Sequence, residues 1–146
     1  MNLSPHFTLA ELTSSETAAR RGIDNTPSAT VLANLKRLAA VLEEIRALQG
    51  RPLIVTSGYR SPAVNRAVGG SPSSAHMTGL AADISMPPLP PFELGQLIIG
   101  AGIEFDQLIH EYRSWVHIGL APEGQTPRRQ QLTIRTGTGY MPGWKP

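Results

Sequence analysis

The sequence predicts one α+β domain in which helices pack on a small, mostly antiparallel sheet. Residues 26–50 have the periodicity of an amphipathic helix, and residues 105–111 and 115–119 alternate like two strands joined by a turn. The order along the chain is helix, strand with loops, helix and hairpin, which is typical of this class. At 146 residues the chain has the size of one domain and can bury a core. We therefore treat residues 1–146 as a single domain.

An N-terminal arm, residues 1–25, is expected to hold short helices. Thr8 and Glu11 have the spacing of a capping box, and Thr13 and Glu16 repeat it. Gly22 can end the second of these helices.

Residues 26–50 are predicted to form the longest helix. Thr26 can cap it, Pro27 suits its first position, and Gly50 ends it. Apolar residues at spacings of three and four mark one buried face: Val31, Leu35, Leu38, Leu42 and Ile45.

The rest of the chain alternates short strands with loops. Residues 53–56 and 80–84 are predicted to form strands. We expect the second to lie in the centre of the sheet, because its small side chains allow a neighbouring element to pack closely. A short helix over 63–68 and another over 91–101 are expected around them. The C-terminal tail, residues 121–146, contains one further strand candidate between Gln131 and Arg135.

Composition narrows the classes of function. Charged residues make up 16% and the net charge is +2, so we expect no nucleic-acid partner. No apolar run approaches the roughly 20 residues that span a bilayer, so we expect no membrane partner. We also expect the protein to be a monomer. The absence of cysteine excludes disulfides and thiol catalysis. The first residues lack the basic and apolar regions of a signal peptide, so we expect synthesis in the cytoplasm.

Three residues are candidate metal ligands. His76 lies in a Gly/Ser-rich loop before a predicted strand, Asp83 lies on that strand among apolar residues, and His117 lies on a later apolar strand. A buried aspartate is costly unless it is paired or metal-bound, and a catalytic zinc takes three such ligands and a water. The pattern alone leaves alternatives open: His117 as a hydrogen-bonded sheet histidine, and Asp83 as an acceptor for a loop.

Three motifs carry a resemblance to a known family. They are Ser57-Gly58-Tyr59-Arg60, the segment from Ser74 to Asp83, and Trp115-Val116-His117-Ile118. In this order they resemble the zinc D-Ala-D-Ala carboxypeptidase family, which includes phage cell-wall endopeptidases of the L,D type. That family belongs to the hedgehog/DD-peptidase superfamily, so the resemblance implies that fold.

The resemblance also implies roles for individual residues. His76, Asp83 and His117 match the positions that bind zinc in the family. Arg60 matches the arginine that binds substrate near the scissile carbonyl, and Ser74 matches a serine expected to hydrogen-bond substrate. Tyr59, beside Arg60, is a candidate substrate contact as a wall of the pocket.

One position departs from the family pattern. Well-known members carry the catalytic Asp or Glu three residues before the last histidine ligand, where this chain has Ser114. Glu111 lies six residues before His117 and can point into the site if the hairpin turns between them. We favour Glu111 as the catalytic base over Asp106, which lies further down the same strand.

These features predict a zinc-dependent hydrolase of peptidoglycan stem peptides, either a D-Ala-D-Ala carboxypeptidase or an endopeptidase. The alternative is a non-catalytic zinc-binding module of the same fold that binds the cell wall or forms part of a phage virion. A cytoplasmic dipeptidase acting on free D-Ala-D-Ala is a weaker reading. We expect a phage-encoded, endolysin-like protein that is released to the cell wall or carried in the virion.

Overall fold

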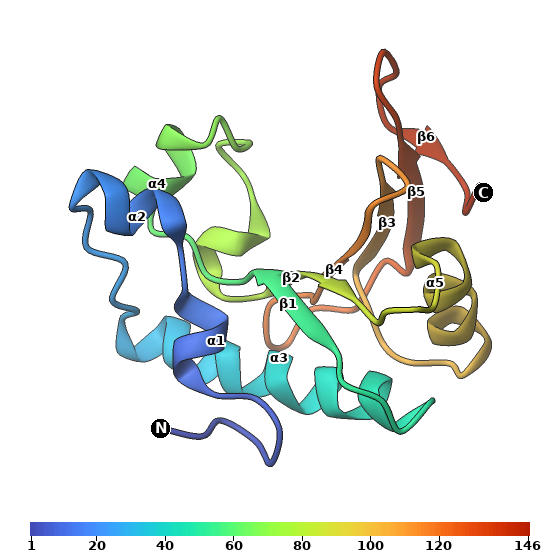
Figure 1. Cartoon of the computed structure of the whole chain (residues 1–146), viewed down its shortest axis with the longest axis horizontal. Helices are drawn as coiled ribbons and strands as arrows, with labels where there is room; N and C mark the ends of the chain where they lie inside the picture. The colour runs from blue at the N-terminus through green and yellow to red at the C-terminus, as the bar shows by residue number, and fades with distance from the viewer.

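Six strands form one sheet, with five α-helices and a short 3-10 helix arranged around it in a computed structural model that describes residues 1–146 (Figure 1). The elements in chain order are α1 (Leu9–Thr13), α2 (Glu16–Arg21), α3 (Ala29–Ala47), β1 (Ile54–Ser57), α4 (Pro62–Ala67), η1 (Ala75–Thr78), β2 (Ala81–Ser85), α5 (Pro91–Gly100), β3 (Gln107–Glu111), β4 (Trp115–Gly119), β5 (Gln130–Ile134) and β6 (Met141–Pro142). The α+β class is therefore confirmed. No helix combines the length and the hydrophobicity needed to cross a membrane.

The strand order in the sheet is β1-β2-β4-β3-β5-β6, and the sheet is mixed. The prediction of a mostly antiparallel sheet is corrected, because β5 runs parallel to β3. The reason lies in the connection: β4 ends at Gly119, opposite Gln107 at the start of β3. The segment 120–129 is short, so β5 starts at the same end of the sheet, with Gln130 also opposite Gln107.

Helix α3 covers the apolar face of the sheet and supplies much of the core. Its buried side chains follow the predicted spacing and comprise Leu35, Leu38, Ala39, Leu42 and Ile45. The helix begins at Ala29 rather than near Pro27, since the Ser28 hydroxyl caps it by accepting a hydrogen bond from the Val31 N–H. The Thr26 N–H donates instead to the Asp24 carboxylate, which holds Thr26 in the preceding turn.

The N-terminal segment is part of this core. Phe7 is 1% exposed and Leu12 is fully buried. The capping box between Thr8 and Glu11 is present at the start of α1. Helix α2 is capped by Ser15 and ends at Gly22 in the left-handed conformation.

The hairpin of β3 and β4 turns at Tyr112 and Arg113, where it was expected. Both residues have left-handed backbone angles, with φ of 54° and 55°. Side chains alternate across β4: Val116 and Ile118 are buried in the core, whereas His117 points to the opposite face.

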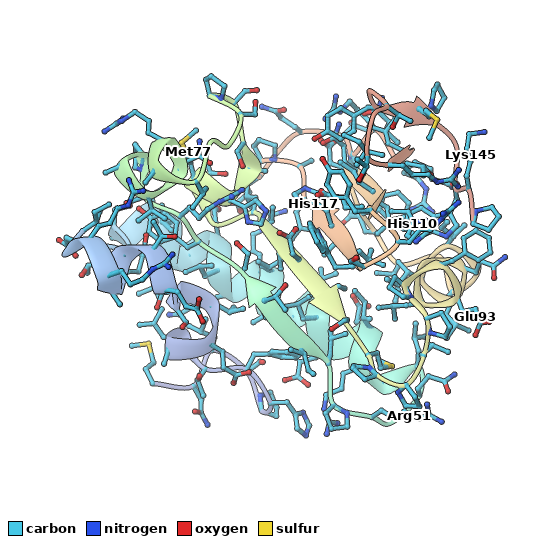
Figure 2. All side chains as sticks on the ribbon, turned by 45° about the horizontal axis from the view of Figure 1, so that its top comes forward. Arg51, Met77, Glu93, His110, His117 and Lys145 are labelled. Atoms are coloured by element: carbon cyan, nitrogen blue, oxygen red, sulfur yellow. The ribbon has the colours of Figure 1, made fainter.

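The C-terminal tail docks onto the body of the protein. Its predicted strand is confirmed as β5, one residue earlier than expected. The Trp144 indole N–H donates to the Phe92 carbonyl at 2.9 Å, and the Trp144 ring occupies the space where a Cβ of Gly95 would lie. His110 is buried beside this contact, and its Nδ1 lies 2.7 Å from the Lys145 carbonyl oxygen (Figure 2).

Candidate active site

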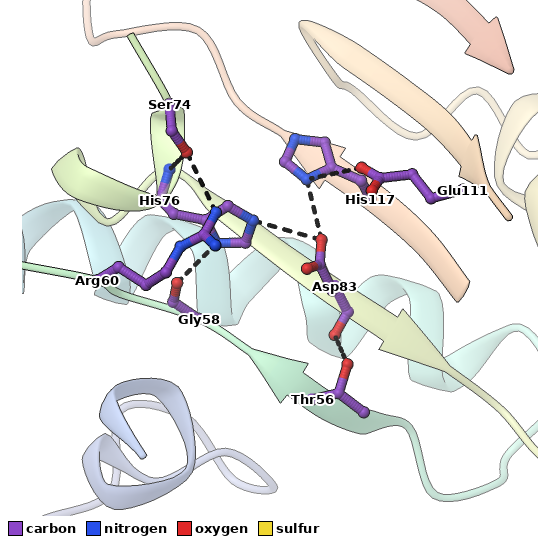
Figure 3. Close-up of polar contacts among 8 residues, drawn as sticks. All are labelled: Thr56, Gly58, Arg60, Ser74, His76, Asp83, Glu111 and His117. Atoms are coloured by element: carbon purple, nitrogen blue, oxygen red, sulfur yellow. Dashed lines mark hydrogen bonds and ion pairs between the residues drawn. The ribbon is translucent and has the colours of Figure 1, made fainter. Parts of the chain in front are cut away.

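Three side chains that can bind a metal converge on the face of the sheet that points away from the core (Figure 3). Asp83 on β2 lies directly opposite His117 on β4 in the strand register. His117 Nδ1 is 3.0 Å from Asp83 Oδ1, and His76 Nε2, which comes from η1, is 3.4 Å from the same oxygen. The fold thus brings together the three predicted metal ligands, although His76 and His117 are 41 residues apart in the sequence.

A backbone carbonyl orients His76. Its Nδ1 lies 2.7 Å from the Gly58 carbonyl oxygen, so Nδ1 carries the proton and Nε2 is free to face Asp83. Gly58 can occupy this position because it has no side chain: a Cβ there would lie 2.4 Å from the Leu12 carbonyl oxygen. That oxygen already accepts a hydrogen bond from the Tyr59 N–H at 2.7 Å.

The electrostatics of the cluster favour an ionised Asp83. Burial raises the pKa of the Asp83 carboxyl, but hydrogen bonds and charge interactions with His117 and His76 outweigh burial and hold the pKa below its usual range. His76 is 2% exposed and His117 is 9% exposed, so the three groups are largely withdrawn from water. A carboxylate and two imidazoles in such surroundings can hold a cation.

The donor set fits a zinc ion. The candidate ligand atoms of His76, Asp83 and His117 all lie within 4.8 Å of one another. Zinc–ligand bonds of about 2.0–2.1 Å in a tetrahedron place neighbouring ligand atoms about 3.3 Å apart, close to the distances present between Asp83 and the two histidines. Metal-binding histidines almost always donate their other ring N–H to a carbonyl, carboxylate or water, and the Gly58 carbonyl fills this place for His76.

Arg60 lies beside this cluster. Its guanidinium Nη2 is 3.4 Å from the Ser74 hydroxyl, and its Nε is buried without an acceptor. Burial lowers the pKa of Arg60, and the charges of Asp83 and Glu111 oppose that shift. Arg60 therefore places a positive charge in the wall of the site, near Asp83 and Glu111.

Glu111 points into the site from the end of β3. Its Oε1 lies 3.7 Å from His117 Nδ1, and its side chain is 15% exposed. Burial raises its pKa, the nearby charge of His117 opposes the rise, and the charge of Asp83 adds to it. Ser114 lies in the exposed turn, where its hydroxyl donates to the Tyr112 carbonyl.

Asp106, the alternative base, is already engaged. Both of its carboxylate oxygens accept hydrogen bonds from the Arg128 guanidinium, the shortest at 2.7 Å. The Arg128 N–H also donates to it, and these contacts lower the pKa of Asp106. The geometry therefore favours Glu111 over Asp106 as the carboxylate next to the ligand cluster.

All these groups line one groove of about 740 Å³. Arg60, Ser74 and Glu111 contribute to its walls together with the three ligand residues. Tyr59 does not line the groove: it is 6% exposed and packs in the hydrophobic core. The expectation that it contacts substrate is therefore corrected. His110 lies on the opposite face of β3, as its alternation with Glu111 predicts.

A histidine–aspartate–histidine cluster beside a half-buried carboxylate, in an open groove, is the arrangement of a metallopeptidase. Comparison with protein families agrees with that class. Residues 5–119 match the family described as Peptidase M15, and the chain belongs to this family. Its peptidases are typically zinc-dependent. A comparison with curated proteins gives no match.

Several groups that shape the site escaped the sequence analysis. Asn25 holds the turn that carries Arg60: its side chain donates to the Tyr59 carbonyl and accepts from the Ser61 N–H. Tyr140, far along the tail, lines the groove. Neither residue lies near a motif in sequence, so only the folded chain reveals its place.

Proposed function

We propose that this protein is a zinc-dependent peptidase that hydrolyses a peptide bond in peptidoglycan stem peptides. The observation that carries the proposal is the position of Glu111, a half-buried carboxylate 3.7 Å from the candidate ligand His117. Under this proposal His76, Asp83 and His117 hold the zinc ion. When bound, zinc would polarise the scissile carbonyl and lower the pKa of a bound water to about 7.

Glu111 is the proposed general base. It removes a proton from the attacking water and returns it to the leaving amine. A carboxylate performs both transfers best when its pKa lies closer to the working pH than that of an ordinary glutamate. The pKa of Glu111 is raised, chiefly by burial, which supports this role.

Arg60 is the proposed substrate anchor. Its guanidinium lies in the groove wall beside Ser74 and can donate to the scissile carbonyl or to a terminal carboxylate of the substrate. The Ser74 hydroxyl, at 3.4 Å from Arg60 Nη2, lies in the same wall and can hydrogen-bond the substrate backbone. Asn25 contributes indirectly by fixing the Arg60 turn.

The substrate class rests on the resemblance and on the shape of the groove. An open groove of about 740 Å³ admits a segment of a longer chain, which suits a stem peptide attached to the cell wall. Cleavage at D-Ala-D-Ala or within a cross-link would both fit. We further propose an endolysin-like role in which the protein acts on the wall of a phage host.

One observation favours a second candidate function. Ser114 stands where the family places its catalytic carboxylate, so a wall-binding module that keeps the metal without the chemistry is the alternative. The two functions differ in whether Glu111 acts on the water.

The test is hydrolysis of purified peptidoglycan by the wild type, Glu111→Ala and His76→Ala, each with and without a chelator, together with the zinc content of each protein. The proposal expects chelator-sensitive activity in the wild type, zinc without activity in Glu111→Ala, and loss of both in His76→Ala. Undiminished activity in Glu111→Ala removes Glu111 as the base. Activity that survives the chelator excludes the zinc mechanism, and an inactive wild type that binds peptidoglycan supports the alternative.

A further inference from the structure

Three aromatic side chains line the groove next to Glu111, and we call them the aromatic wall: Tyr112, Trp115 and Tyr140. Tyr112 is 44% exposed and Tyr140 is 60% exposed. The rings of Tyr112 and Trp115 contact each other, with centroids 5.7 Å apart and planes inclined at 52°. Exposed aromatic rings gathered along a groove indicate a binding surface rather than a core.

The turn that presents Tyr112 is strained. Tyr112 and Arg113 both have left-handed φ angles. This conformation is unfavourable for residues with bulky side chains, and in tight hairpin turns it is usually adopted by Asn or Gly. No packing in the core requires a tyrosine there, because its ring is largely exposed. A strained conformation that persists beside a reactive groove points to use of the side chain it positions.

The third ring comes from beyond the part of the chain that matches the family. The match ends at residue 119, whereas Tyr140 directly precedes β6. Strand β6 pairs with β5 and β5 pairs with β3, and this order brings Tyr140 to the groove. A tyrosine hydroxyl keeps its proton at neutral pH, so Tyr140 can donate a hydrogen bond in the groove.

The chemistry of the surroundings indicates a carbohydrate. The wall itself is uncharged and carries the hydroxyl groups of Tyr112 and Tyr140. Flat rings bind the C–H face of a sugar ring, and neutral hydroxyl groups hydrogen-bond its edge. A charged polymer would need ionic partners on the wall, and an acyl chain would need an enclosed apolar pocket.

We propose that the aromatic wall binds a sugar ring of the glycan strand next to the stem peptide, an inference that rests on the proposed function. The wall therefore favours peptides that are still attached to glycan over free peptides.

The first test compares the KM for a stem peptide linked to its disaccharide with the KM for the same peptide free. In the wild type the linked peptide has the lower KM. Tyr112→Asn and Tyr140→Ala are each expected to reduce this preference by about three- to tenfold, the range that one stacked ring supplies. Tyr140→Phe, which keeps the ring, retains most of it.

Two controls separate binding from folding. Asn tolerates the left-handed conformation, so Tyr112→Asn should have a melting temperature equal to or above that of the wild type. Ile54→Ala removes another exposed apolar side chain, one outside the groove, and should keep the preference for linked peptide. An equal change of KM on linked and free peptide, or no change on either, would overturn the proposal.

The second test does not depend on hydrolysis. Binding of a tetrasaccharide of β-1,4-linked N-acetylglucosamine is followed by tryptophan fluorescence, with saturable binding expected in the wild type and at least tenfold weaker binding in a Tyr112→Asn/Tyr140→Ala double variant. Stem-peptide hydrolysis without tetrasaccharide binding refutes this inference and leaves the proposed function standing. Binding without hydrolysis refutes the proposed peptidase activity and leaves the sugar site standing.

Discussion

Gly58 offers the sharpest test of how the fold prepares the metal site. Its carbonyl oxygen orients His76 at 2.7 Å, and the missing side chain lets the Leu12 carbonyl approach closely. In Gly58→Ala the new Cβ would lie 2.4 Å from the Leu12 oxygen and 3.0 Å from the Leu12 carbonyl carbon. Since ordinary contacts between such atoms exceed about 3.3 Å, the backbone of α1 or of the Gly58 turn must move by nearly 1 Å.

That shift has two expected consequences. Overpacking of this kind lowers the free energy of unfolding by about 1–3 kcal/mol. Loss of the carbonyl contact that orients His76 is expected to weaken zinc affinity by about 10- to 100-fold, the usual effect of losing a group that orients a metal ligand. Thermal unfolding of the metal-free protein measures the first effect, and zinc titration against a competing chelator measures the second.

Gly100→Ala is the matched control. Gly100 ends α5, and a Cβ there would contact nothing within 4 Å. The substitution should leave zinc affinity unchanged and alter stability by about 1 kcal/mol or less, in the stabilising direction. If Gly58→Ala matched this control in zinc affinity, the Gly58 carbonyl would not orient the ligand and the reasoning would be wrong.

Three further predictions concern the tail and the groove rim. Gly95→Ala should displace the Trp144 ring and lower the melting temperature measured by circular dichroism, since a Cβ has no room there. Burial lowers the pKa of His110, so the unfolded chain binds a proton at this histidine at a higher pH than the folded protein does. The free energy of unfolding, measured by denaturant titration, should therefore be constant above about pH 6.5 and decrease below it. In His110→Phe this decrease should be smaller. Arg128→Ala removes an ion pair with Asp106 in which the arginine side chain is 60% exposed, so chemical denaturation should detect a loss of less than about 1 kcal/mol.

Much of the site was readable from local sequence because its chemistry is concentrated in short motifs. His76, Asp83 and His117 are rare residue types placed in small-residue or apolar segments, where an unpaired polar group would be costly. Because side chains alternate between the two faces of a strand, the sequence of the hairpin also predicted which of its side chains lie on which face. It placed Glu111 on the side of His117 and His110 on the other, as the structure has them.

Other predictions depended on choices that local sequence leaves open. Thr26 and Ser28 can both cap a helix, and the hydrogen bond between Asp24 and Thr26 decides in favour of Ser28. Tyr59 lies in a motif of the site, yet its side chain turns into the core. A motif identifies which residues occur together, but the backbone direction at each residue decides which side chains reach the groove.

The sequence alone therefore determined the α+β class, the long helix and the hairpin, because each follows from periodicity. It also indicated three candidate metal ligands, through scarce residue types and through motifs that resemble those of a known family. Only the tertiary structure decided that β5 runs parallel to β3, that Asn25 holds the Arg60 turn and that Tyr140 lines the groove. These features join segments distant in sequence, and their geometry depends on how connections cross the sheet and which surfaces pack. Such long-range contacts leave no periodic or local signal in the chain.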